Sequence, residues 1–204
     1  MLRRLSIIAA TVLPALFIAG TSANAAPAPR MTSPRVDFGG ANDWCNPTGF
    51  QLCLRDPSDG GAGTTVVASF HSDSNAEDWR LISDTGRCPN GTVTSSCPGG
   101  WVSSNFRGFP ILVLKNVGQG TLCIRTAATT NFVAKMGTCD SGNEISSAFV
   151  WAQFGNGTFG FDSVDASNVF SQQEWLTGAS ANDSTVTDNP GGVTAFGEWL
   201  PTNS

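Results

Sequence analysis

One pattern recurs three times in this chain and limits the folds that it can adopt. Each copy opens with a short apolar strand, continues through a polar turn and a second short strand, and ends at a tryptophan. The opening strands are predicted at residues 50–55, 120–125 and 172–177, and the tryptophans are Trp79, Trp151 and Trp199. Because a repeated unit buries its apolar face against its neighbours, the three tryptophans are expected to share one core.

Aligned positions inside the copies support the repeat. Residues 52–55 and 122–125 both have the sequence Leu-Cys-aliphatic-Arg, and Trp175 stands at the cysteine position of the third copy. From this position to the closing tryptophan the chain runs 26, 28 and 24 residues. Such similar spacings indicate equivalent units, and Trp175 is expected to be a fourth tryptophan of the core.

Further strands are predicted between the copies. The runs 108–116 and 157–168 alternate like strands and complete the first two units, while 83–107 is an insertion in the first unit. The third unit ends at Trp199, and Pro34–Phe38 is expected to supply its last strand from the other end of the chain. Three four-stranded units that close on each other form an all-β fold, the β-trefoil, without exposed sheet edges. A β-sandwich is the alternative.

The motifs of these units resemble those of the ricin B-chain type of β-trefoil. That family has a Cys-Leu-Asp-like opening strand, a second cysteine later in the unit, and a Gln-x-Trp motif. Cys123, Cys139 and Trp151 are similar to this pattern, and Glu77 stands two residues before Trp79, in the place of the glutamine. The resemblance implies a trefoil fold for residues 36–204 as a single domain, and a lectin-like binding module.

The same resemblance implies that the sugar sites of the family are not retained. In the family, an aspartate two residues after the opening cysteine accepts hydrogen bonds from the sugar. The equivalent positions here hold Arg55, Arg125 and Thr177, and the glutamine positions hold Glu77, Phe149 and Gly197. Galactose recognition of the ricin type is therefore not expected at any of the three sites.

The N-terminus resembles an export signal. Arg3 and Arg4 precede the apolar run 5–20, and small residues lead to a predicted cleavage after Ala25. An uncleaved membrane anchor is the alternative, but the run is shorter than the ~20 apolar residues that span a bilayer. The mature protein is expected to be secreted, with no membrane span.

All six cysteines lie beyond this signal, and an even number in an exported chain predicts disulfides. The sequence alone does not choose among the possible pairings, and local pairing is favoured. The expected bonds are Cys45–Cys53, Cys88–Cys97 and Cys123–Cys139.

Several kinds of chemistry are not expected. The formal charge is −5 and lysine and arginine are not clustered, which argues against nucleic acid as a partner. His71 is the only histidine, and with its neighbours Ser72 and Asp73 it cannot form a catalytic triad, because adjacent residues do not orient as nucleophile and base. The run 73–78 lacks the spacing and glycine of a calcium loop. The protein is thus expected to be no enzyme and to need no metal or cofactor.

Two segments are candidates for binding. The insertion is expected to form a disulfide-closed rigid loop, which makes Trp101, Phe106 and Arg107 the predicted ligand-binding residues, although Trp101 alternatively closes the barrel end. The leader 26–35, with Arg30 and Arg35, is predicted to be flexible and to dock on a partner protein.

The expected function is that of a secreted, non-catalytic binding module for an extracellular glycan or cell-surface polymer. The alternative is a protein-binding adaptor or inhibitor subunit of a secreted, toxin-like complex. A hydrolase is a third hypothesis, for which the sequence offers carboxylates but no way to place a pair of them.

Overall fold

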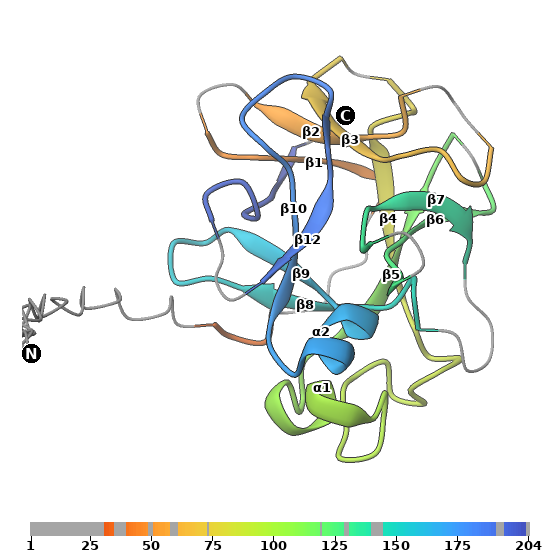
Figure 1. Ribbon diagram of the computed structural model, residues 1–204, viewed down its shortest axis with the longest axis vertical. Coiled ribbons are helices and arrows are strands. Elements are labelled where there is room, and N and C mark those ends of the chain that lie inside the picture. The colour runs from red at the N-terminus through yellow and green to blue at the C-terminus, as the bar shows by residue number, and fades with distance from the viewer. Residues whose placement is uncertain are drawn as a thin grey trace, which may run out of the picture.

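The fold is seen in a computed structural model (Figure 1). The described residues are 31–34, 40–48, 51–57, 61–72, 74–118, 120–128, 131–139, 145–190 and 194–202. The predicted signal segment 1–25, Arg30 and Arg35 lie outside them. No helix among the described residues has the length and apolar character needed to cross a membrane.

Six strands, two from each unit, form a closed antiparallel barrel. They are β1 (Asn42–Cys45), β4 (Asp78–Ser83), β5 (Ile111–Asn116), β8 (Phe149–Gln153), β9 (Phe159–Ser163) and β13 (Leu200–Thr202). Each of the first four pairs with the next, and β13 pairs with β1. A bridge between Phe159 and Trp199 joins β9 to the residue before β13, which closes the ring.

Each unit also contributes one hairpin. The hairpins are β2 (Leu52–Arg55) with β3 (Val67–Phe70), β6 (Leu122–Arg125) with β7 (Lys135–Thr138), and β10 (Glu174–Thr177) with β12 (Thr187–Pro190). The short strand β11 (Ser184–Thr185) adds to β3. A barrel of six strands with three hairpins is a β-trefoil, so the predicted fold is confirmed and the sandwich alternative is wrong.

A ring of three backbone hydrogen bonds joins the three units. The N–H of Val66 donates to the carbonyl of Ala134 at 2.9 Å, that of Ala134 to Val186 at 2.9 Å, and that of Val186 back to Val66 at 3.0 Å. All three residues are fully buried. The ring satisfies backbone groups that no water reaches, and its threefold form shows that the three residues hold equivalent positions.

The repeated tryptophans fill the barrel core. Trp79, Trp151 and Trp199 are at most 4 % exposed. The indole N–H of Trp79 donates to the carbonyl of Leu54 at 2.8 Å, and that of Trp199 donates to Leu176 at 3.0 Å. These bonds tie the closing tryptophans of the first and third units to the opening strands of the same units, so the sequence repeat corresponds to a structural one.

The strand that closes the barrel from the N-terminal side is β1, and not Pro34–Phe38 as predicted. Pro34 is buried but belongs to no strand, and residues 35–39 lie outside the described part. Proline cannot donate to a ladder, whereas Trp44 in β1 packs edge-on against Trp151 and Phe161. Burial of this indole in the barrel core explains why β1 takes the closing position.

The run 157–168 is only partly a strand, which corrects the prediction for its second half. β9 ends at Ser163, and the helix α2 (Val164–Phe170) follows at once. The Ser163 hydroxyl accepts a hydrogen bond from the backbone N–H of Ala166, so this serine is the N-cap. The capping interaction favours a helix over continued strand alternation.

The insertion builds a second apolar core outside the barrel. It contains α1 (Gly100–Asn105), which packs beside α2 at the end of the molecule opposite hairpin β2–β3 (Figure 1). The core includes Phe106, Ile111, Val150, Phe154, Val164 and Trp175. Trp175 is buried as predicted, but it faces this second core and lies 6.2 Å from the ring of Phe106.

One glycine allows this core to close against β9. A Cβ atom at Gly160 would come within 2.5 Å of the Phe154 ring and 2.8 Å of the Trp175 ring. Only glycine leaves room there for both rings, so the outer face of β9 is shaped to receive Trp175.

The described part of the leader lies against the domain. Thr32 and Gln153 exchange two backbone hydrogen bonds, of 2.9 and 3.0 Å, and Met31 packs on the second core. Residues 31–34 therefore belong to the folded domain, whereas the rest of the predicted leader 26–35 lies outside the described residues.

The disulfides are Cys45–Cys53, Cys88–Cys97 and Cys123–Cys139, the pairs expected from the sequence. The first links β1 to β2, the second closes the insertion, and the third lies at the β6–β7 hairpin. Closing the 16-residue separation of the third stabilises by about 3 kcal/mol in the chain-entropy model.

Burial predicts how the tryptophans differ in stability. Replacing Trp79, Trp151 or Trp199 with alanine is expected to lower the free energy of unfolding by about 3–5 kcal/mol, because the change removes buried area and leaves a cavity. Trp101 is half-buried at the edge of the second core, so Trp101→Ala is expected to cost less. Urea unfolding of the four variants measures this. A silent Trp199→Ala change would contradict the equivalence of the third unit.

Candidate functional site

The three ligand-binding residues predicted in the insertion do not form one surface. Phe106 is 1 % exposed and packs against Trp101, Phe109 and Trp175. This corrects its assignment, because a ring in the core cannot touch a ligand. Trp101 is half-buried and Arg107 is exposed, so these two remain accessible at the α1 end of the molecule.

In the first unit, the residues at the positions that correspond to sugar-binding residues of the ricin type contact each other. The Arg55 guanidinium lies 3.9 Å from Glu77 Oε1, and its Nη1 donates to the Ser69 hydroxyl at 3.4 Å. Glu77 is fully buried. The Arg55 guanidinium thus neutralises the Glu77 carboxylate, which leaves neither of these two side chains as a free acceptor for a sugar hydroxyl.

The second and third units close these positions in other ways. Phe149 lies in the barrel core, and the Arg125 guanidinium donates to the Ser146 hydroxyl at 2.7 and 2.9 Å. The Thr177 hydroxyl donates to the backbone carbonyl of Trp175. A Cβ atom at Gly197 would lie 2.8 Å from this hydroxyl. None of these side chains offers the carboxylate acceptor of the family.

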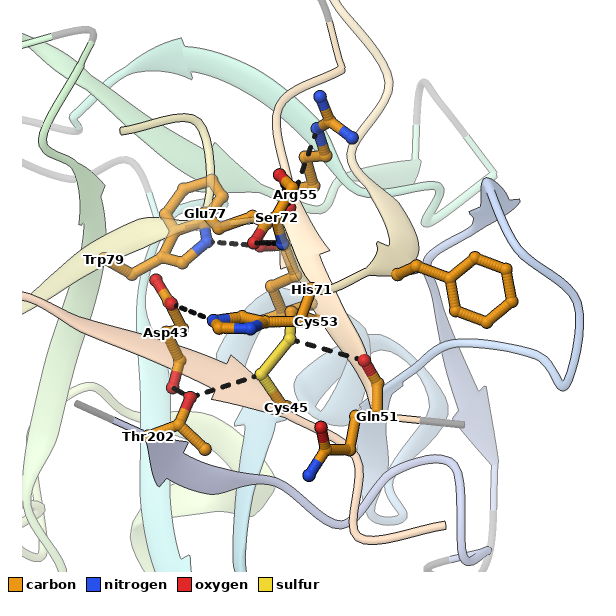
Figure 2. The surroundings of a disulfide bond; sticks show 12 residues. Asp43, Cys45, Gln51, Cys53, Arg55, His71, Ser72, Glu77, Trp79 and Thr202 are labelled. Carbon is orange, nitrogen blue, oxygen red and sulfur yellow. Dashed lines mark hydrogen bonds and ion pairs between the residues drawn. A yellow bond between two sulfur atoms is a disulfide. The ribbon is translucent and has the colours of Figure 1, made fainter. Parts of the chain in front are cut away.

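A polar cluster lies beside the Cys45–Cys53 disulfide (Figure 2). His71 follows β3, Glu77 precedes β4 and Asp43 belongs to β1, so the fold brings together residues 28 and 34 positions from Asp43. His71 Nε2 lies 2.7 Å from Asp43 Oδ2. The Ser72 hydroxyl and backbone N–H donate to the two carboxylate oxygens of Glu77 at 2.6 and 2.8 Å. The sequence contained no signal for this pairing of Asp43 and His71.

The electrostatics at Asp43 are unbalanced. Burial raises the pKa of Asp43, and the neighbouring carboxylate of Asp78, its cross-strand partner, raises it further, although the hydrogen bond to His71 acts the other way. Its carboxylate atom Oδ1 is buried and accepts no hydrogen bond from the described residues. Asp43 is therefore the member of the cluster whose negative charge its described neighbours satisfy least.

A cationic pocket lies on the outer face of β4 and β5. It has a volume of about 220 Å³ and is lined by Arg80, Ile82, Lys115, Asn116, Val117 and Gly120. Arg80 and Lys115 are directly opposite each other across the two strands. Neither side chain makes a hydrogen bond or ion pair with any described residue. Like charges that face each other across a sheet are destabilising, so the pair is suited to an external anion.

A second pocket, of about 300 Å³, lies at hairpin β6–β7. Arg125 and Lys135 line it and are again cross-strand partners. Here the guanidinium is already held by the Ser146 hydroxyl, which leaves Lys135 as the more available cation. The Arg80–Lys115 pocket is therefore the better anion site of the two.

The third unit contains buried carboxylates in place of a pocket. Burial raises the pKa of Asp162 and Asp188 well above the usual value, although hydrogen bonds to Asp162 from the Ser167 hydroxyl and the Glu174 N–H act against this shift. Hydrogen bonds from the Thr126 and Ser163 hydroxyls lower the pKa of Asp188, but burial has the larger effect. Asp162 is fully buried and Asp188 is only partly exposed, so these two carboxylates present little surface to a ligand.

The chain is a β-trefoil protein. No family model and no curated protein matches it. Among solved structures it is similar to ThreeFoil, a designed 3-fold symmetric protein, with a TM-score of 0.57 and 13 % identity over 81 % of this chain and 100 % of that one. It is also similar to a mosquitocidal holotoxin, with a TM-score of 0.61 and 15 % identity over 83 % of this chain, but it spans only 18 % of that protein. At these identities the likenesses show the fold.

The buried carboxylates predict a pH dependence of stability. A carboxyl whose pKa is higher in the folded state contributes stability that is present below its unfolded pKa, 3.8 for aspartate, and is lost as the pH rises through the folded value. Asp188→Asn removes this loss, so the variant is expected to gain stability relative to the wild type as the pH rises from about 4 to about 8. Urea unfolding across this range measures the difference, with the exposed Asp183→Asn as control. A difference that stays constant or shrinks would refute the prediction.

Proposed function

We propose that the protein is a secreted, non-catalytic binding module whose ligand is an acidic glycan or acidic cell-surface polymer, held in the Arg80–Lys115 pocket. The observation that carries the proposal is the cross-strand pair of cations without a partner, in a chain whose net charge is −5. A carboxylate, sulfate or phosphate bound between them removes their repulsion and forms charge-assisted hydrogen bonds.

The rest of the pocket suits a sugar ring. Ile82 and Val117 are 37 % and 38 % exposed, which gives the pocket an apolar flank for the C–H face of a saccharide. Asn116 also lines the pocket and is fully buried, and its side-chain N–H₂ donates to the Ala76 carbonyl. The pocket thus combines two cations, an apolar flank and a fixed amide, the mixture expected of a site with a few placed polar groups.

The positions that bind sugar in the ricin type argue against a neutral sugar as ligand. Arg55 and Arg125 stand where that type has an acceptor, and both are engaged by other side chains of the protein. Neither position offers the carboxylate that neutral galactose requires in the ricin type. The disulfides and the β-trefoil fold are compatible with a stable module acting outside the cell.

Binding to a glycan array that pairs carboxylated, sulfated and phosphorylated glycans with their neutral counterparts tests the proposal. Acidic members alone are expected to bind, and binding is expected to weaken as salt increases. Arg80→Ala and Lys115→Ala are each expected to lower the affinity roughly tenfold or more, since a hydrogen bond to a charged group contributes about 1.5–3 kcal/mol.

Two controls locate the site. Lys135→Ala changes the cation of the β6–β7 pocket, and Arg107→Ala changes the cation of the insertion; both are expected to leave the affinity unchanged. Equal binding of acidic and neutral glycans would sink the proposal. Loss of binding in Arg107→Ala or Trp101→Ala, with Arg80→Ala unaffected, would move the site to the insertion.

A second candidate function, that of a protein-binding adaptor, is favoured by an exposed apolar patch. Val169 and Phe170 at the end of α2 are 56 % and 50 % exposed, and the Phe170 ring lies 5.0 Å from that of Phe132. Aromatic and aliphatic side chains gathered at one exposed place are typical of protein interfaces.

The adaptor hypothesis predicts a stoichiometric partner in the native extracellular medium. Phe170→Asp is expected to abolish co-purification of that partner, because it puts a charge into an apolar contact, while Arg80→Ala is expected to retain it. Deletion of residues 26–30 tests whether the leader also contributes. Recovery of the same partner with Phe170→Asp would count against this surface.

A further inference from the structure

We propose that Asp43, His71 and Glu77 form a binding site for a zinc ion. One imidazole nitrogen and one oxygen from each carboxylate lie within 4.8 Å of one another. This site is separate from the Arg80–Lys115 pocket and does not depend on the function proposed for it. It also departs from the expectation from the sequence that the protein needs no metal.

The first argument is the uncompensated oxygen of Asp43. Asp43 and Glu77 are both fully buried; Glu77 is paired with Arg55 and Ser72, whereas Oδ1 of Asp43 accepts no hydrogen bond from any described residue. The Asp78 carboxylate lies beside Asp43 as its cross-strand partner and adds negative charge. Burying a carboxylate oxygen without a donor is costly, and a divalent cation coordinated by that oxygen removes the cost.

The second argument is the spacing of the three ligand atoms. Zinc binds histidine nitrogen and carboxylate oxygen at about 2.0–2.2 Å, which puts neighbouring ligands of a tetrahedral ion about 3.4 Å apart. His71 Nε2 and Asp43 Oδ2 lie 2.7 Å apart, and no two of the three ligand atoms are more than 4.8 Å apart. The required spacing falls inside this range, so small side-chain movements admit the ion.

The third argument is that the ligands are already oriented. Both carboxylate oxygens of Glu77 accept hydrogen bonds from Ser72, and Cys45, two residues from Asp43, is fixed to Cys53 by the disulfide (Figure 2). Hydrogen-bonded partners behind a ligand hold its position and raise metal affinity. The His71 side chain is 28 % exposed, so it lies on the solvent side and gives the ion a way in.

The ligand set selects the metal. An imidazole with two carboxylates suits zinc, with a water molecule as the fourth ligand. Calcium prefers six or more oxygen ligands, which three side chains do not supply. The ion would tie β1 to the β3–β4 connection and thereby stabilise the first unit.

Zinc titrated into the untagged, chelator-treated protein tests the site. Calorimetry is expected to show one equivalent of zinc and no comparable binding of calcium. Because the chain has a single histidine, the imidazole nitrogen resonances of labelled protein report on His71 alone. These resonances are expected to shift on addition of zinc, and binding is expected to weaken as the pH falls, because the ligands must be deprotonated.

His71→Gln and Asp43→Asn are each expected to lower the zinc affinity at least tenfold, while Glu198→Gln, a carboxylate bonded to Asn156 instead, is expected to leave it unchanged. His71→Gln changes a partly exposed side chain and is expected to fold, and the resonance shift in the wild type needs no variant at all. Absence of zinc binding, binding that leaves the His71 resonances unmoved, or unchanged affinity in both variants would each overturn the site. Glycan binding at the Arg80–Lys115 pocket is measured separately, so either proposal can fail alone.

Discussion

Three backbone hydrogen bonds, from Val66 to Ala134, from Ala134 to Val186 and from Val186 back to Val66, hold the hairpins of the three units together. Each residue donates once and accepts once, and none is exposed. A unit that left this ring would abandon two buried backbone partners, at a cost comparable to two lost hydrogen bonds. The barrel and the tryptophan core depend on this closure, because each unit buries its apolar face only against the other two.

The three units share equivalent core positions, but their outward-facing residues differ. At one outward position the units carry Cys53, Cys123 and Trp175. The two cysteines are buried and form disulfides with Cys45 and Cys139, whereas the larger indole is covered by a second apolar core. The insertion of the first unit supplies it through Phe106, so a change in one unit is matched by an addition in another. The same divergence produces the cationic pocket and the acidic cluster at different places on a common frame.

The sequence predicted the β-trefoil because the three units keep similar spacings and each ends in a large tryptophan, although their short motifs differ. Prediction from the sequence failed after Ser163, because the local capping interaction of this serine begins the helix α2. It also failed for Phe106, because the burial of this ring depends on tertiary packing. Both candidate sites required strand register that no single sequence displays. Arg80 and Lys115 become partners only through the β4–β5 ladder, and Asp43 reaches His71 only through the disulfide-linked strands.

Native-state hydrogen exchange of three amides, those of Val66, Ala134 and Val186, tests the threefold closure most directly. If the ring unites the units, all three amides exchange only when the whole domain unfolds, with the same free energy of opening as the most protected strands. The three exchange rates should be equally slow in the wild type and should rise together when a core tryptophan is truncated. Exchange of Val186 by local opening, much faster than that of Val66 and Ala134, would show that the third unit is not held by the other two.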